Sequence, residues 1–251
     1  MKSGSKKNGS NMKIDILGIK FDCLSLAAVC GKIEAMIEKG GCYQVGTMNP
    51  EYVVRVQDNK QLARAISRMS LVVPDGMGII WAAKLKKLGR LKRIRGGDLV
   101  EVLAELCARK GYKIGLVGGE RGVAQKALRV LQKKYPGLQG FVDNGPDLAA
   151  LNEKIIKKIQ KEKPQVLLTA LSFKGPVWTD QLLSKLKKKK ISLVAFEVGG
   201  VFNYLTGKSR VPPKIIKEIG LEWFWRLATE PWRWKRQLKL VKFLWLVARY
   251  N

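Results

Sequence analysis

Residues 165–200 read QVLLTALSFKGPVWTDQLLSKLKKKKISLVAFEVGG, and this stretch decides the fold. Two short apolar runs, VLLTAL and ISLVAF, flank a segment in which Leu182, Leu183 and Leu186 recur at the three- and four-residue spacing of a helix. Strands that are apolar on both faces are typical of a buried parallel sheet. The stretch therefore predicts a strand–helix–strand unit, with its helix over residues 177–189.

The same alternation continues through the rest of the chain. Further strands are predicted at KIDILGI (13–19), CYQVGTM (42–48), SLVVPDG (70–76), YKIGLVGG (112–119) and LQGFVDN (138–144). Helical patterns fill the intervals at residues 24–39, 50–69, 77–88, 98–110, 122–134 and 148–161. We therefore predict an α/β fold: a doubly wound, mostly parallel, Rossmann-like sheet that binds ligands beyond the carboxyl ends of its strands.

Composition divides the chain into three parts. Residues 1–12, MKSGSKKNGSNM, lack an apolar run and predict a disordered basic arm, not a signal peptide. Residues 13–206 hold the strand–helix alternation and predict the α/β core. A shift in composition near Gly207 marks the expected start of a helical C-terminal appendage, residues 207–251.

The appendage is rich in tryptophan and in cations. It holds five of the seven tryptophans, and its eleven lysines and arginines face three glutamates. Indole rings favour headgroup depth in a bilayer, while lysine and arginine reach lipid phosphate. The appendage therefore predicts peripheral binding to an anionic membrane surface.

The charge of the chain points to a polyanionic partner. Forty-eight Lys and Arg against 20 Asp and Glu give a net charge of +28. Nucleic acid, an anionic membrane and phosphorylated substrates would each fit this charge. No helix-turn-helix, RRM or KH motif is present, so we predict no nucleic-acid partner.

Two further classes of site are disfavoured. The chain has no histidine, and its four cysteines form no CxxC pair, so neither a zinc site of the usual type nor a histidine triad is expected. Unpaired thiols fit a reducing cytosolic setting.

No apolar stretch reaches 18 residues, so no transmembrane helix is predicted. Formation of a homo-oligomer is left open.

Polar residues follow two of the predicted strands at their carboxyl ends. Thr47 and Asn49 come after CYQVG, and Asp75 comes after SLVVP. Two interpretations stay open. These side chains cap the helices that begin near Pro50 and Met77, or they line a ligand site in which Asp75 acts as a general base.

Glycine pairs follow two other strands. Gly118 and Gly119 come after YKIGLV, where the exposed N–H groups of a turn favour phosphate. Because neither a dinucleotide fingerprint nor a P-loop is complete there, the loop is interpreted either as a diphosphate site or as a tight turn. Gly199 and Gly200 follow the last strand and permit close approach of the backbone to a ligand.

Cations near the second glycine pair suit a phosphorylated ligand. Lys208 and Arg210 could neutralise a phosphate. No Asp-x-Asp pair occurs in the chain, so we expect N–H groups and cations, and no bound metal, to meet phosphate charge. No cofactor is predicted, and whether a divalent cation assists is left open.

These ordered motifs resemble the WecG/TagA/CpsF family of bacterial glycosyltransferases. The matching stretches are TMNPEYVVRVQDN, LVVPDGMGIIWAAK, GGDLVEVL, YKIGLVGGERGVAQKALRVLQKKYPGL, VGGVFNYLTGKSRVPPK and GLEWFWRLATEPWRWKRQ. The resemblance covers nearly the whole chain. It implies that residues 13–206 are the glycosyltransferase core.

The resemblance also implies an activity and a location. Such enzymes transfer N-acetylmannosamine or a related sugar from a UDP-sugar donor, with inversion, to an undecaprenyl-diphosphate-linked GlcNAc. The product serves cell-surface polysaccharides such as teichoic acid, enterobacterial common antigen or capsule. The implied location is the cytoplasmic face of the bacterial plasma membrane, where the protein is held peripherally.

The resemblance assigns roles to individual residues. It implies that Asp75 is the general base and that Thr47 and Asn49 line the same site. The C-terminal appendage of the family carries arginines that Arg226, Arg233 and Arg236 match in this chain. By this resemblance the three would reach the lipid diphosphate. Their spacing of seven and three residues places them on one face of a continuous helix, unless Pro231 breaks it. Ordinary interfacial cations stay as the alternative.

Three segments depart from the family pattern. Where the family carries P-K-Q-E-x-W, residues 174–178 read KGPVW, without the Gln and Glu. Where the family often has a His-Gly-Tyr-Phe-like stretch, residues 142–146 read VDNGP. In the G-x-F-D-F motif, Asn203 replaces Asp. These departures leave an alternative open: a catalytically altered member that acts as a scaffold or UDP-sugar-binding component of a lipid-linked glycan assembly complex.

Overall fold

The computed structural model describes residues 12–144, 153–213, 215–216, 219–231 and 234–249, so nearly all of the predicted N-terminal arm lies outside the described part. At its centre is a six-stranded sheet in the order β4-β3-β8-β7-β5-β6, in which every neighbouring pair is parallel. The strands are β3 (Cys42–Met48), β4 (Leu71–Pro74), β5 (Lys113–Gly118), β6 (Gln139–Asp143), β7 (Val166–Ala170) and β8 (Leu193–Glu197). The predicted parallel sheet is confirmed.

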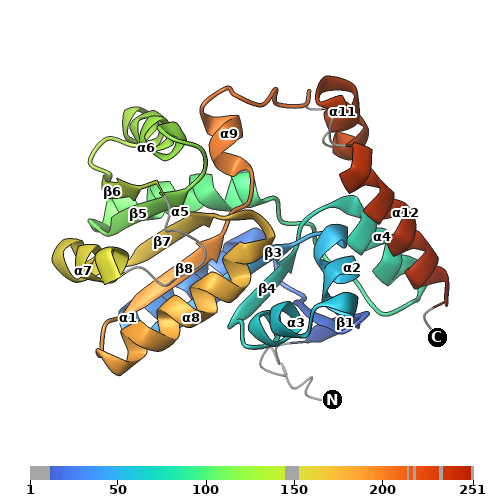
Figure 1. The fold of residues 1–251 in the computed structure, drawn as a ribbon, viewed down its shortest axis with the longest axis horizontal. Helices are drawn as coiled ribbons and strands as arrows, with labels where there is room; N and C mark the ends of the chain where they lie inside the picture. Colours follow the sequence, from blue (N-terminus) through green and yellow to red (C-terminus); the bar gives the residue numbers. More distant parts are fainter. Residues whose placement is uncertain (1–11, 145–152, 214, 217–218, 232–233, 250–251) are drawn as a thin grey trace, which may run out of the picture.

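Helices cover both faces of this sheet (Figure 1). One face packs against α1 (Leu26–Lys39), α5 (Gly96–Lys110) and α6 (Val123–Lys134). The opposite face packs against α7 (Glu153–Glu162) and α8 (Gly175–Lys188). Burying both faces explains why the central strands are apolar throughout, and the predicted doubly wound α/β architecture is confirmed.

The other elements surround this three-layer body. They are β1 (Lys13–Ile16), β2 (Ile19–Asp22), α2 (Pro50–Asp58), α3 (Lys60–Ser67), α4 (Met77–Leu85), the 3₁₀ turn η1 (Ser172–Lys174), α9 (Val201–Leu205), α11 (Glu222–Thr229) and α12 (Trp234–Arg249).

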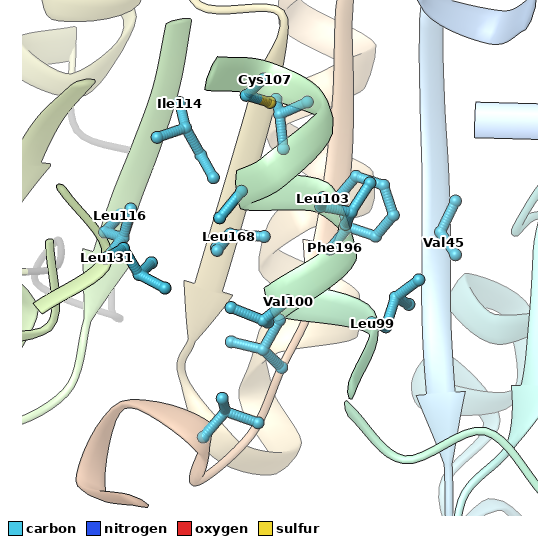
Figure 2. Packing of buried hydrophobic residues seen from close by; sticks show 14 of the residues in the cluster. Val45, Leu99, Val100, Leu103, Cys107, Ile114, Leu116, Leu131, Leu168 and Phe196 are labelled. Carbon is cyan, nitrogen blue, oxygen red and sulfur yellow. The ribbon is translucent and has the colours of Figure 1, made fainter. Parts of the chain in front are cut away.

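Helix α5 shows how periodicity builds the core. Leu99, Leu103 and Cys107 recur every four residues and face the strands, with Phe196 of β8 opposite them (Figure 2). All four side chains are at most 1% exposed. Burial raises the pKa of the Cys107 thiol to about 12, so this cysteine stays protonated and unreactive.

Residues 50–69 form two helices where the sequence predicts one. Asn59 is extended (φ −135°, ψ 92°), and its side chain accepts a hydrogen bond from the Leu62 N–H at 2.9 Å. The chain thus ends α2 and begins α3 at the same residue. Asparagine competes with helix continuation because its side chain offers the backbone another acceptor.

Residues 13–22 form a hairpin, whereas the pattern predicts one strand over residues 13–19. Strands β1 and β2 pair antiparallel, and Leu17 and Gly18 both have positive φ values, 54° and 88°. Such a two-residue turn matches the twist of antiparallel strands. Asp15 stabilises it by accepting a hydrogen bond from the Gly18 N–H at 2.8 Å.

The C-terminal segment packs against the body. Helix α12 lies along α2 and α4, and its Phe243 and Val247 are 0% and 3% exposed within a core shared with both (Figure 1). The boundary predicted near residue 207 stays a prediction. Across the described residues, no helix combines the length and apolarity needed to span a bilayer.

Replacing Val247 with alanine should destabilise the protein by about 2 kcal/mol, because it removes two buried methyl groups and leaves a cavity. Val241→Ala, the same substitution on the same helix at a side chain that is 64% exposed, is the matched control and should change stability far less. Urea unfolding of both variants measures the difference. Equal losses would show that α12 does not depend on its buried face.

Candidate active site

A cleft of about 1100 Å³ opens at the carboxyl ends of the parallel strands. Thr47 of β3, Gly118 of β5, Ala170 of β7 and Glu197 of β8 line it, and Asp75 joins them directly after β4. Doubly wound folds bind ligands at this edge of the sheet. The cleft is therefore the candidate active site.

The cleft gathers eight of the twelve site residues predicted from sequence. Those that line it are Asp75, Thr47, Asn49, Gly118, Gly119, Gly199, Gly200 and Arg226. Lys208 and Arg210 do not belong to its described walls. Arg233 lies outside the described residues, and for Arg236 only the backbone, within α12, is described.

Asp75 does not cap the helix that follows it. Helix α4 has Gly76 at its N-cap and no side-chain cap. The carboxylate interacts instead with the backbone N–H of Gly96, at the start of α5. Of the two interpretations open for Asp75, capping of α4 is wrong.

The surroundings of Asp75 shift its proton affinity. Burial raises the pKa of the Asp75 carboxyl above its ordinary value, and the charge of Glu222 adds to the rise. Arg93 and Arg226 oppose it, since a nearby positive charge favours the carboxylate. The net rise brings Asp75 closer to the range in which a general base works well near neutral pH.

Helix α11 carries two charged residues to this part of the cleft. Glu222 forms an ion pair with Arg93, whose side chain is 12% exposed. Arg226 hydrogen-bonds the hydroxyl of Tyr204, and its guanidinium carbon lies 4.7 Å from the centre of that ring. Helix α11 thus contributes Glu222 and Arg226 to the wall of the cleft.

Sequence reasoning missed Arg93 and Glu222. Arg93 lies three residues before the GGDL motif, and its proximity to that motif was the available sign that it belongs to the site. Pairing it with Glu222 requires the fold, because 129 residues separate the two.

Thr47 and Asn49 are both held in place by hydrogen bonds. The Thr47 hydroxyl donates to the backbone carbonyl of Glu197 at 3.1 Å. The Asn49 side chain accepts from the Glu51 N–H at 2.9 Å and caps α2. The capping interpretation of Asn49 is confirmed, and the same side chain lies at the wall of the cleft.

The two glycine pairs differ in their surroundings. A Cβ at Gly118 would lie 2.8 Å from the Ala170 carbonyl oxygen, and the Gly119 N–H donates to that oxygen at 3.0 Å. The first pair therefore makes a tight turn, as one of the two interpretations held. Cβ atoms at Gly199 and Gly200 would meet nothing within 4 Å, so the second pair leaves room for a ligand beside the backbone.

Lys208 is engaged by Glu120 in an ion pair between exposed side chains. Glu120 itself lines the cleft, whereas Lys208 contacts Glu120 without lining the cleft. Asn203, which replaces the Asp of the family motif, does line the cleft.

Glu197 is a buried carboxyl that sequence reasoning did not single out. It is 3% exposed, and the Thr179 hydroxyl donates to its Oε1 at 2.5 Å. A Cβ at Gly175 would lie only 2.1 Å from its Oε2. The carboxyl thus occupies the space beside the first turn of α8, in the segment that lacks the family's Gln and Glu.

Burial raises the pKa of Glu197 to about 7, against the lowering effect of the hydrogen bond from Thr179. Near neutral pH this group is therefore protonated in part of the molecules. An available signal was a charged residue at the end of an otherwise apolar strand, LVAFE.

The part of the chain that the structure describes contains no group of three or more Cys, Asp and Glu able to hold an ion.

Comparison with known proteins identifies the family to which the chain belongs. A family model described as Glycosyl transferase WecG/TagA/CpsF family matches residues 14–251. An N-acetylglucosaminyldiphosphoundecaprenol N-acetyl-beta-D-mannosaminyltransferase from Bacillus subtilis (strain 168) is 25% identical over 207 residues, which cover 82% of this chain and 78% of that protein. A protein of the same name from Staphylococcus aureus (strain MRSA252) is 24% identical over 250 residues, covering 97% and 95%. The chain is therefore a glycosyltransferase and belongs to the WecG/TagA/CpsF family.

Proposed function

We propose that this protein transfers N-acetylmannosamine or a related sugar from a UDP donor to an undecaprenyl-diphosphate-linked GlcNAc, with inversion. The product would enter a cell-surface polysaccharide such as teichoic acid or capsule. The names of the relatives support the acceptor and the sugar. The observation that carries the proposal is Asp75 in the cleft, with its pKa raised, between Arg93, Glu222 and Arg226.

The proposed reaction is a single displacement. A hydroxyl of the acceptor sugar attacks the anomeric carbon as the bond from that carbon to the UDP oxygen breaks. The Asp75 carboxylate takes the hydroxyl proton, and UDP leaves with the bonding electrons. A sugar hydroxyl is a weak nucleophile, so positioning by Thr47 and Asn49 contributes much of the rate.

Cations would stabilise the charge that develops on the departing diphosphate. Arg226 lines the cleft beside Asp75, and we assign it to a diphosphate group. Its anchor on Tyr204 fixes the guanidinium, so little side-chain freedom is lost on binding.

Turnover with defined substrates tests the proposal. UDP-N-acetylmannosamine and a short-chain prenyl-diphosphate-GlcNAc should yield UDP and a lipid-linked disaccharide. A parallel reaction with EDTA measures whether a divalent cation assists. The alternative is a scaffold, favoured by the altered segment around Gly175. It would bind UDP-sugar but release no UDP with any acceptor, and that result would contradict the transferase proposal.

We also propose that helices α4 and α12 form the membrane-facing surface. Between them lies an apolar groove of about 460 Å³ lined by Trp81, Leu85, Phe243 and Leu244. Trp81 is 46% exposed, Leu85 70% and Leu244 53%. Contiguous apolar exposure bordered by lysines such as Lys84 suits the interface of an anionic bilayer.

Replacing both Trp81 and Leu244 with glutamine should weaken binding to anionic vesicles at least about tenfold. In the wild type both apolar side chains move from water into the bilayer on binding, and glutamine loses this gain. Co-sedimentation with phosphatidylglycerol vesicles measures this. Since both side chains are exposed, turnover of a water-soluble acceptor should stay near normal. Unchanged vesicle binding would place the membrane contact elsewhere on the protein.

A further inference from the structure

We propose that Arg55, Phe173 and Lys239 form a diphosphate-binding subsite at the wall of the cleft, built jointly by the core and the C-terminal helix. Arg55 comes from α2, Phe173 from η1 and Lys239 from α12. The assignment to a diphosphate rests on the proposed function, which brings two such groups to the cleft. The cluster itself follows from geometry.

Phe173 is the centre of the cluster. The guanidinium carbon of Arg55 lies 3.6 Å from the centre of its ring. Tyr52 packs against the same ring edge-to-face, with centroids 5.1 Å apart, and its hydroxyl donates to the Ser172 carbonyl at 3.4 Å. Tyr52, Arg55 and Phe173 all line the cleft. The ring is therefore a fixed platform for the guanidinium.

Arg55 is held by stacking, which leaves its hydrogen-bond donors available. A guanidinium that lies flat on a ring keeps its N–H groups at the edge, where they can bind an oxyanion at two points. Its Nε is buried without a hydrogen-bond partner, and Arg55 forms no ion pair with any carboxylate among the residues described. Buried donors without a partner are rare in folded proteins, so this half-buried guanidinium is suited to an oxyanion ligand.

Further positive charge surrounds the same ring. The Lys239 ammonium lies 5.5 Å from the ring centre without itself lining the cleft, and the exposed Lys174 lines the cleft next to Phe173. Like charges gathered at a concave wall repel one another until an anion binds between them. The cluster thus favours a ligand that carries more than one negative charge.

A diphosphate matches this arrangement. The guanidinium can hold oxygens of one phosphate, and a lysine can act as a point charge toward the second. Arg226 lies on a different element, α11, beside Asp75, so the cleft has a second cationic position for the second diphosphate of the reaction. The ligand of the Phe173 cluster is either the nucleoside diphosphate or the lipid diphosphate.

Calorimetric titration of three probes tests the subsite: inorganic diphosphate, UDP and a short-chain prenyl-diphosphate-GlcNAc. Arg55→Gln and Lys239→Gln should each weaken binding of inorganic diphosphate by about tenfold or more. If UDP binding falls by the same factor, the cluster holds the donor. If binding of the prenyl compound falls instead, it holds the acceptor. Arg55→Lys should restore only part of the loss, because lysine lacks the fork.

Lys242→Gln is the matched control. Lys242 sits one turn after Lys239 on α12 and pairs with Asp58 of α2 at 2.9 Å, so this change removes the same charge and a contact between the same helices. It should leave all three affinities unchanged. If Arg55→Gln alters none of them, or if Lys242→Gln lowers them equally, the subsite is refuted. Because inorganic diphosphate binds without turnover, an inactive wild-type protein would refute the proposed function alone.

Discussion

Replacing Asp75 with asparagine should lower kcat by about 10²- to 10⁴-fold, the usual contribution of a general base. Asparagine keeps an oxygen that can face the Gly96 N–H, so the start of α5 keeps its acceptor while the site loses the proposed base. The affinity for the UDP-sugar should change little. Initial rates of UDP release, measured with the short-chain acceptor, give this difference.

The pH dependence of the wild type adds a second expectation. Asp75 must be ionised to accept a proton, and its pKa is raised by burial. The rate should therefore fall as the pH drops through that raised pKa, at a higher pH than for an ordinary aspartate. Asp180→Asn, which removes a carboxylate from an exposed pair with Arg68, is the control and should not change the rate. Near-normal turnover of Asp75→Asn would assign the base to another group.

Raising the pH from about 4.5 to about 8 should destabilise the folded protein by on the order of 3 kcal/mol through Glu197 alone. In the folded state the pKa of Glu197 is raised to about 7 by burial, whereas its ordinary value is 4.5. Between these values the folded state holds a proton that the unfolded state has lost. Stability from this group is therefore complete below pH 4.5 and is lost as the pH rises through 7.

Glu197→Gln isolates this effect, because glutamine has nearly the same shape and does not titrate. Urea unfolding at several pH values should show a much flatter profile for the variant. The raised pKa of Asp75 acts in the same direction, so Asp75→Asn with Glu197→Gln should be flatter still. If the single Glu197→Gln variant keeps the full wild-type slope, Glu197 does not hold its proton in the folded protein.

Local patterns predicted the sheet and the position of Asp75. Apolar runs of strand length, separated by helical periods, are properties of short windows, and the doubly wound topology follows from them. Because parallel strands end at one edge, residues just after strands meet there. The sequence alone therefore predicts that Asp75, Thr47 and Gly199 lie close together.

Contacts between distant parts of the chain lay beyond such reasoning. Glu197 and Gly175 meet because α8 packs against β8. No local sequence pattern indicates that the Glu197 carboxyl occupies the space in which a Cβ at residue 175 would lie. The break at Asn59 was missed for another reason: the apolar period continues across it, and a single side-chain hydrogen bond decides the outcome.

The ion pair between Arg93 and Glu222 has a consequence for modularity. Its two partners come from the core and from the C-terminal segment, and both adjust the charge next to Asp75. The two segments are therefore not interchangeable parts. A chimera that joins this core to the tail of a relative 24% identical must inherit an acid that matches Glu222, or the partly buried Arg93 loses this ion pair.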